Sequence, residues 1–522
     1  MRQAVAAGAR TQTRNVMALP AVRGWVSAET LAAARPGGAL RLENWFPTKT
    51  SIRLRGGNIK YATISTGPVL RMFNYKSGAV EKFFASDETK VFEITTVADA
   101  DVIPSAAISG QTSGYYATAQ MGTAGGDFLS ICNGTDTPQY FDGTTWAAHT
   151  LTGYATPADF NFNFVFASRL WFIPVDSRSA YYLGPDAING ALTEFSLNGV
   201  FQDGGFLIGA YKWSQDSGSG LDDSLVFVSS TGEVAVYQGT DPSSATTWSK
   251  VGLYQVTPPM GANANMRAGG DLLLATEAGI VPISQAVSKD VSALSLASIT
   301  AAIEPDWKVE VTARKTLPWE IIKWPTNNMM VVSLPVTNEG VSEACFVANL
   351  ETGGWAKFTG WNTRCLGHFD GYGYFGTNDG TIHKMEVGGS DDGVPYVCTY
   401  IGLPDHMRAP GIHKVIHSVR STFRASVPFK AKVSASVNYK IQLPTPPASV
   451  ADYTTDEWDS GLWDQATWDS AGTVDSRAIV ASIGRSGYVI SPQVQVTCAV
   501  TPFPRLELIA SDVEYETGGF LV

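Results

Sequence analysis

A unit of two apolar strands joined by a short polar turn recurs along the middle of the chain, and this repetition constrains the fold most. Successive turns begin 41 to 60 residues apart, close to the length of a four-stranded propeller blade with variable loops. The turns lie at Ser86–Thr89, Asn133–Asp136, Val175–Arg178, Ser229–Gly232, Thr276–Gly279, Val336–Gly340 and Thr377–Gly380. A single sheet cannot bury both faces, whereas a ring of sheets can. We therefore predict a β-propeller of about six or seven blades, with a β-sandwich or two packed barrels as the alternative.

Composition agrees with an all-β fold. Among 522 residues there are 51 Gly and 27 Pro, and aromatic residues make up 11%, a balance that favours short strands and turns over long helices. Two helices are nevertheless predicted as additions to this scaffold. One spans Asp290–Ile303 and ends before Pro305, because Leu296, Ile299 and Ile303 recur at helical spacing. The other is a short helix over Ala28–Ala34.

Charge is distributed unevenly along the chain, whose formal net charge is −11. Residues 1–60 hold ten Lys and Arg against two acids, and residues 401–440 hold seven against one. Residues 451–522 reverse this balance with three against eleven, and residues 61–400 hold 17 basic and 34 acidic side chains. The repeat region is therefore acidic, and we expect the basic amino end to pack on the acidic carboxyl end.

These patterns divide the chain into three parts. Residues 1–65 form an N-terminal platform segment, residues 66–388 form the propeller, and residues 389–522 form a C-terminal β-rich platform domain. We expect the two chain ends to build one flanking platform.

Motifs that carry chemistry give little support for an enzyme. Gly371–Gly376 matches the dinucleotide-binding glycine pattern, but a turn and another strand follow it instead of a helix. His413 and His417 have metalloprotease spacing without the general-base Glu or a third ligand. The five cysteines are scattered without a CxxC pair. We expect no catalytic residues, no cofactor and no metal site.

A tryptophan-aspartate pair recurs every five residues near the carboxyl end, at Trp458, Trp463 and Trp468. Period five would place successive tryptophans on opposite faces of a strand, so an irregular segment anchored on another surface is favoured. A calcium site built from the adjacent aspartates is the alternative.

Partners are constrained by charge and hydropathy. An acidic chain is a poor ligand for DNA phosphates, although DNA can pass an acidic surface without sticking. No stretch approaches the ~20 apolar residues of a membrane-spanning helix, and the amino end lacks the apolar run of a secretory signal. We expect a protein made in a reducing compartment.

The segment from Gly24 and Trp25 through Asn44, Trp45, Phe46 and Pro47 to Arg55 and Gly56 resembles the amino-terminal region of tail nozzle proteins from short-tailed bacteriophages. The tryptophan-aspartate run and the closing Asp512–Gly519 are also similar to the carboxyl region of that family.

The resemblance implies a structural virion protein, made in the host cytoplasm, that forms a sixfold ring at the tail tip. In that role it binds copies of itself, the head-to-tail adaptor protein and tail fibres, and the genome leaves through its channel without tight binding. The residues of the motif, together with the three tryptophans of the run, are expected to shape the subunit and its ring contacts. In particular, Trp25, Trp45, Phe46 and Pro47 are expected in the platform core, and Arg55 with Gly56 in a plain turn.

A carbohydrate-active or carbohydrate-binding propeller is the main alternative function. Aromatic side chains also bind sugar rings, and Asp222 with Asp223, or Asp391 with Asp392, could supply the carboxylate pair of a glycosidase. Adjacent acids before Ser or Gly are more often solvated turn residues. A secreted bacterial propeller is a third interpretation, disfavoured by the missing signal segment.

Overall fold

The computed structural model describes residues 13–28, 36–216, 221–336, 343–426, 429–449, 475–499 and 505–517. The chain divides into two units. The platform unit contains residues 1–59, 347–360 and 386–522, and the propeller unit contains residues 60–346 and 361–385. The main limits lie six and three residues from the expected ones, and residues 347–360 also belong to the platform unit.

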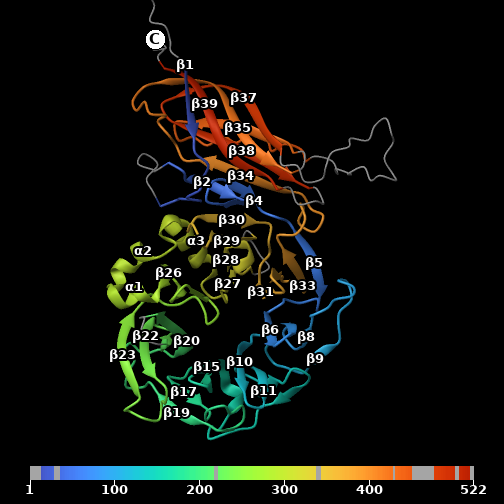
Figure 1. Ribbon diagram of the computed structural model, residues 1–522, viewed down its shortest axis with the longest axis vertical. Helices are drawn as coiled ribbons and strands as arrows, with labels where there is room; N and C mark the ends of the chain where they lie inside the picture. The colour runs from blue at the N-terminus through green and yellow to red at the C-terminus, as the bar shows by residue number, and fades with distance from the viewer. Residues whose placement is uncertain are drawn as a thin grey trace, which may run out of the picture. The chain divides into compact units, whose positions relative to one another are not determined.

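Seven successive sheets follow one another around a ring in the described part of the propeller unit (Figure 1), which confirms the predicted β-propeller. The first four are four-stranded. The first two contain β6 (Arg71–Ser77), β7 (Val80–Ser86), β8 (Val91–Glu93) and β9 (Ala106–Ile108), then β10 (Ala117–Thr123), β11 (Gly126–Cys132), β12 (Gln139–Phe141) and β13 (Trp146–Ala148). The next two contain β15 (Phe160–Phe166), β16 (Arg169–Pro174), β17 (Ser179–Tyr182) and β19 (Thr193–Ser196), then β20 (Leu207–Asp216), β21 (Leu221–Ser229), β22 (Glu233–Gly239) and β23 (Trp248–Gln255). A separate parallel pair is formed by β14 (Leu151–Thr152), which precedes β15 in sequence, and β18 (Gly190–Ala191), which lies between β17 and β19.

The last three sheets differ from this pattern. The fifth has β24 (Asn265–Ala268), β25 (Asp271–Thr276) and β26 (Gly279–Pro282), and the sixth has β27 (Ile321–Trp324), β28 (Met329–Ser333) and the first half of β29 (Ala344–Asn349). The seventh has β31 (Cys365–Phe369), β32 (Tyr372–Gly376) and β33 (Thr381–Met385). Its fourth strand is β5 (Asn58–Thr63), which comes from before the first sheet. The ring is therefore closed by pairing the start of the propeller sequence with its end.

The seven turns found in the sequence occupy one equivalent place in the blades. Each joins the second and third strands of its sheet, as Asn133–Asp136 does between β11 and β12. Asn133 Oδ1 accepts the backbone N–H groups of Thr135 and Asp136 at 3.1 and 2.9 Å, which fixes the turn locally. In the sixth turn only Val336 belongs to the described residues.

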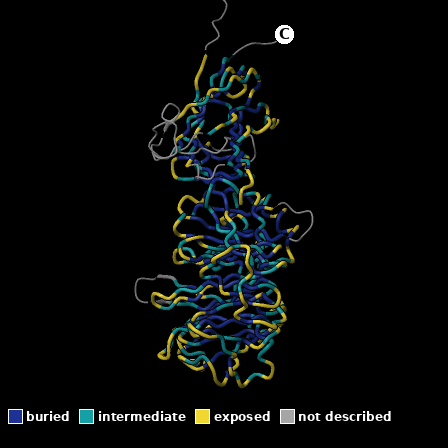
Figure 2. Tube along the Cα trace, turned by 90° about the vertical axis from the view of Figure 1, so that its right-hand side faces the viewer, coloured by how far each residue is buried: buried dark blue, intermediate teal, exposed yellow. Residues whose placement is uncertain are grey.

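Apolar side chains fill the spaces between neighbouring sheets of the propeller. Buried residues follow the strands while exposed residues gather in the loops (Figure 2). Between the seventh and first sheets, Phe83 stacks on Phe369 with ring centres 4.9 Å apart, beside buried Ala62 of β5. This contact gives the closure an apolar core in addition to its backbone pairing.

The helix predicted over Asp290–Ile303 is wrong in its extent. The segment forms two short 3₁₀ turns, Val291–Ala293 and Ala301–Ile303, around the four-residue α2 (Leu294–Ala297). Ser298 is extended at ψ 147°, which interrupts the helix. Among the described residues, the longest helix is instead α3 (Glu304–Arg314), with Pro305 in its first turn. Proline is tolerated there because the first N–H groups of a helix have no internal partner, so Pro305 helps to begin a helix instead of ending one.

The other helices add little to the propeller. A further short helix, α1 (Ile283–Ser288), follows β26, and a 3₁₀ turn at Pro157–Asp159 precedes β15. A last 3₁₀ turn, Pro325–Asn327, joins β27 to β28. All but the first residue of the helix expected over Ala28–Ala34 lies outside the described residues.

Both chain ends build the platform unit, as charge indicated. One sheet joins β3 (Trp45–Pro47), β4 (Ile52–Leu54), β39 (Glu507–Thr517), β35 (Lys414–Ala425) and β37 (Asp475–Gly487), and β1 (Thr13–Ala18) also pairs with β39. The other continues from the second half of β29 through β30 (Trp355–Thr359), β2 (Ala39–Glu43), β34 (Tyr396–Gly402), β38 (Ile490–Cys498) and β36 (Ala431–Val437).

Candidate functional site

The motif residues Asn44 to Pro47 join the two sheets of the platform unit. Asn44 separates β2 from β3 and has a left-handed backbone at φ +60°, which asparagine adopts more readily than most residues. The sharp bend lets Trp45 pair with Leu54 in the β3–β4 hairpin. Trp45, Phe46 and Pro47 are all buried, and so is Trp25.

The Asn44 side chain makes four hydrogen bonds that tie this bend to distant strands. Its Nδ2 donates to Thr359 Oγ1 at 2.9 Å and to the Val397 carbonyl at 2.7 Å. Its Oδ1 accepts from the Thr359 backbone N–H at 2.9 Å and from Arg55 Nε at 2.8 Å. All polar valences of the amide are therefore used, and they connect segments more than 300 residues apart in sequence.

Arg55 lies at the centre of the same network with no exposed side-chain area. Its guanidinium donates to both carboxylate oxygens of Asp391, at 2.8 and 2.6 Å, and to the carbonyls of Gly56 and Thr359. Burial acts to lower the pKa of Arg55, but the hydrogen bond to Asp391 and nearby negative charge outweigh it and raise the pKa. Arg55 is therefore a permanent buried cation and not part of a plain turn.

Asn58 and Tyr396 complete the surroundings of this ion pair. Asn58 Nδ2 donates to Asp391 Oδ1 at 2.9 Å. The Tyr396 ring lies 3.8 Å from the guanidinium carbon of Arg55, and its hydroxyl donates to the Arg55 carbonyl at 2.6 Å. Burial raises the pKa of Tyr396, which keeps the hydroxyl protonated as a donor. We call Asn44, Arg55, Thr359, Asp391 and Tyr396 the Arg55 network.

The two motif glycines allow close approach of other segments. Gly24 has φ +76°, and a Cβ added there would lie 2.4 Å from the Trp355 backbone nitrogen. A Cβ on Gly56 would lie 2.7 Å from the Glu386 backbone. Glu386 accepts from the Gly56 N–H at 3.0 Å and from Arg53 Nη1 at 2.8 Å. At both positions a side chain would therefore collide with the neighbouring backbone.

Sequence reasoning missed the partners of the motif. Asp391 was expected to be a solvated turn residue or a sugar-cleaving carboxylate, and Thr359 and Tyr396 carried no signal. The lone clue was an acid pair in a Gly-rich segment, Ser390–Gly393, far from any other motif. Trp458, Trp463 and Trp468 lie outside the described residues.

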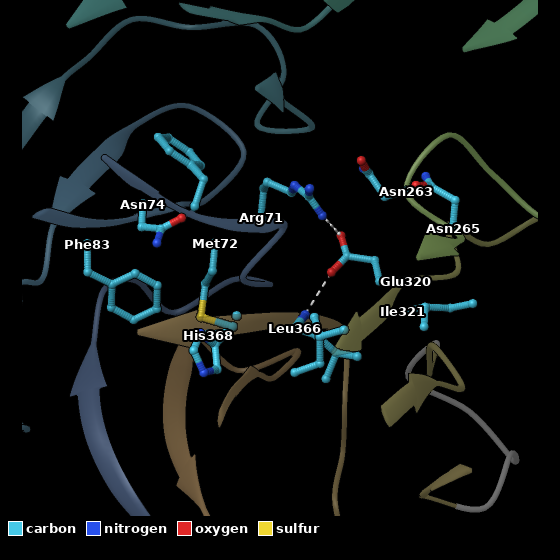
Figure 3. A pocket seen from close by; sticks show the side chains of 13 residues that line it. Arg71, Met72, Asn74, Phe83, Asn263, Asn265, Glu320, Ile321, Leu366 and His368 are labelled. Carbon is cyan, nitrogen blue, oxygen red and sulfur yellow. Dashed lines mark hydrogen bonds and ion pairs between the residues drawn. The ribbon is translucent and has the colours of Figure 1, made fainter. Parts of the chain in front are cut away.

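A polar cavity of about 310 Å³ opens on the inner strands of the propeller unit (Figure 3). Residues of β6, β27 and β31 line it, with Asn263 and Asn265 before and in β24. Arg71 Nη1 pairs with Glu320 Oε1 at 2.5 Å, and Glu320 Oε2 accepts the Leu366 N–H at 2.7 Å. The charged pair thus joins the first, sixth and seventh sheets at the cavity wall.

The remaining motif candidates are not grouped for catalysis. Gly371–Gly376 lies in the β31–β32 hairpin, as expected for a blade. His417 Nε2 lies 3.5 Å from Glu516 Oε2 on the platform. Over the part of the chain that the structure describes, no three His, Cys, Asp or Glu side chains gather as a metal site would require. The described helices include none long and apolar enough to cross a membrane.

Comparisons with known proteins give structural similarity at low sequence identity. No protein-family model and no curated protein sequence matches the chain. Among solved structures, the chain is similar to the WD40 propeller domain of Doa1, at 11% identity and TM-score 0.37 over 63% of this chain and 97% of that one. It is also similar to YCF48 bound to a D1 peptide, at 11% identity and TM-score 0.35 over 62% and 93%. The chain is similar as well to BamB from Moraxella catarrhalis, at 11% identity and TM-score 0.35 over 66% of this chain and 93% of that one.

Proposed function

We propose that the protein is a structural subunit of a phage tail nozzle, a ring through which DNA leaves the capsid. The observation that carries this proposal is the use made of the motif residues Asn44 and Arg55. Both lie in a buried, fully hydrogen-bonded network that holds the platform strands together. A motif used in this way supports a structural function, in which the subunit must keep its shape under mechanical force.

The same network weakens the glycosidase alternative at one of its two carboxylate pairs. Asp391 binds Arg55 through both oxygens and also accepts from Asn58. With its oxygens engaged in these hydrogen bonds, Asp391 is poorly placed to act on a sugar as one of two flanking carboxylates. Asp223, of the other pair, forms an ion pair with Lys212 and accepts from Ser214 Oγ at 2.5 Å.

Charge on the propeller supports passage of DNA without capture. The propeller unit holds 30 acidic residues against 17 Lys and Arg. Such a surface repels phosphates and releases no counterions from DNA, so binding gains nothing from this source. A conduit for a moving genome requires this property, whereas a DNA-binding domain requires the opposite.

In this proposal the protein has no enzymatic activity and needs no cofactor. It assembles as a homohexameric ring in the virion tail, after synthesis in the host cytoplasm, and binds the head-to-tail adaptor and tail fibres. A subunit of such a ring needs two different complementary surfaces, because it meets its neighbours head to tail.

The test is the mass of the purified protein in solution, alone and with the adaptor protein, by native mass spectrometry. A closed ring, alone or on addition of the adaptor, is the expected result. A monomer or trimer under both conditions that binds or degrades a host polysaccharide would overturn the proposal in favour of a carbohydrate-active propeller.

A further inference from the structure

The edge strand β37 of the platform unit is long, apolar and accessible. It spans Asp475–Gly487 and pairs with β35 on one side. On its other side no strand forms a ladder with it among the residues that the structure describes, although near its end Arg485 Nη1 donates to the Ala435 carbonyl of β36 at 2.9 Å. Between Arg477 and Arg485 it has neither a charge nor a proline, and Val480 exposes 62% of its surface. An edge of this kind attracts another strand unless something covers it.

The same sheet has a second open edge at β1. This strand pairs with β39 along Thr13–Ala18, and the described part of the chain places no strand on its outer side. It also exposes an apolar side chain, since Met17 is 57% exposed. One sheet therefore presents two different unpaired edges, one at each side.

Strand direction makes these two edges complementary to each other. β1 is antiparallel to β39, β39 is antiparallel to β35, and β35 is antiparallel to β37. After three reversals, β1 and β37 run in opposite directions. When two copies lie side by side in the same orientation, β37 of one copy therefore meets β1 of the next as an antiparallel pair, the commoner kind of pairing.

We propose that β1 and β37 join neighbouring copies of this chain head to tail, through main-chain hydrogen bonds and contact between Met17 and Val480. The inference rests on the ring of the proposed function and names the surfaces that build it. Because the two surfaces differ, the join propagates from copy to copy instead of stopping at a dimer. A second copy is favoured because Met17 and Val480 lie in one cross-strand row, through Asp512 and Arg420, and so on the same face of the sheet.

The first experiment is disulfide trapping with the full chain, in the presence of the adaptor if the ring needs it. The double variant Met17→Cys/Val480→Cys should form a ladder of covalent oligomers under oxidation, and each single variant should not. The five native cysteines are all buried, so background cross-linking should be low. Dimers from Val480→Cys alone would indicate a two-fold β37–β37 contact and overturn the head-to-tail join.

The second experiment keeps the proposal testable if the cysteines are badly aligned. Val480→Lys should abolish the ring in native mass spectra, because lysine on an edge blocks strand addition. The matched control is Val309→Lys on α3, where Val309 is 66% exposed, and it should leave the ring mass unchanged. A normal ring from Val480→Lys without a ladder from the cysteine pair would refute the β1–β37 join while the nozzle proposal stands.

The remaining outcomes separate the two proposals. If the wild-type chain forms no ring with or without adaptor, the proposed function fails, and this join fails with it. If Val480→Lys still forms the ring but loses adaptor binding, β37 receives an adaptor strand and the join between copies is wrong.

Discussion

The guanidinium carbon of Arg55 lies 3.8 Å from the centre of the Tyr396 ring, while the Tyr396 hydroxyl donates to the Arg55 carbonyl at 2.6 Å. Each residue thus fixes both the side chain and the backbone of the other. An aromatic face and a carboxylate together replace the water that a buried cation loses. The arrangement makes Arg55 a central link between the platform strands.

Replacing Arg55 should therefore destabilise the platform unit strongly. We expect Arg55→Ala to cost about 3–5 kcal/mol, because it leaves the Asp391 carboxylate buried without its cation. Hydrogen exchange should show lost protection in β34 and β2, with propeller strands such as β16 unchanged. Arg41→Ala is the control, since Arg41 pairs with Glu43 but is 46% exposed, and should cost below about 1 kcal/mol. Equal effects of the two variants would contradict the central role of Arg55.

Gly24 should tolerate no side chain. Gly24→Ala adds a Cβ 2.4 Å from the Trp355 nitrogen at a residue with φ +76°. Gly78→Ala is a matched control, because Gly78 has φ +56° but nothing within 4 Å of the added atom. Left-handed strain alone costs about 1–2 kcal/mol, so Gly78→Ala should lose about that much in urea unfolding. Gly24→Ala should lose more, and equal losses would show that the contact with Trp355 does not matter.

His149 should make the propeller unit sensitive to mild acid. Burial lowers the pKa of His149 to about 4 from 6.5. Its Nδ1 lies 2.9 Å from the Ile188 carbonyl and its Nε2 lies 2.9 Å from Ser130 Oγ. Since a carbonyl only accepts, Nδ1 carries the proton of the neutral ring and Nε2 accepts from Ser130.

The sign of the pH effect follows from that lowered pKa. The unfolded chain takes up a proton near pH 6.5 and the folded chain only near pH 4, so stability is complete above pH 6.5 and falls as the pH drops towards 4. We expect a loss of about 2 kcal/mol between pH 7 and pH 5. His149→Gln should remove most of this slope, whereas the exposed His417→Gln should keep it. Urea unfolding of the three proteins at both pH values measures the effect.

Duplex DNA should not bind the protein appreciably. The propeller unit holds 30 acidic residues against 17 basic ones. We therefore expect a Kd larger than about 10⁻⁴ M at physiological salt, which is a weaker affinity than that of the usual non-specific DNA binders. Fluorescence anisotropy of a labelled duplex checks this. A micromolar Kd, with an association constant whose logarithm falls linearly with the logarithm of the salt concentration, would contradict an inert conduit.

The blades were predictable because their turns are local. Asn133 and Asp87 each hold a turn through side-chain bonds to backbone N–H groups two and three residues ahead, so the residue types alone locate it. The Asp290–Ile303 helix failed for an equally local reason. Apolar spacing indicated one buried face, but Leu296 is 81% exposed, and the extended Ser298 ends the helix early.

Long-range partners were beyond sequence reasoning. Asp391 meets Arg55 across 336 residues, and no pattern near either residue encodes the other. The same holds for β5, whose place in the seventh sheet depends on ring closure and not on its own sequence. The burial of Trp25 and Trp45 was expected, but the complete burial of Arg55 beside them was not.

Closure by β5 also sets the order in which the protein can mature on the ribosome. Lys60–Thr63 leaves the ribosome before any blade, yet its partner β33 (Thr381–Met385) follows more than 300 residues later. At a synthesis rate of roughly 5–20 residues per second, about 15–65 s pass between the synthesis of β5 and that of its partner strand β33. During that interval the backbone groups of β5 are unpaired. The propeller ring can close only when translation of its last blade is finished.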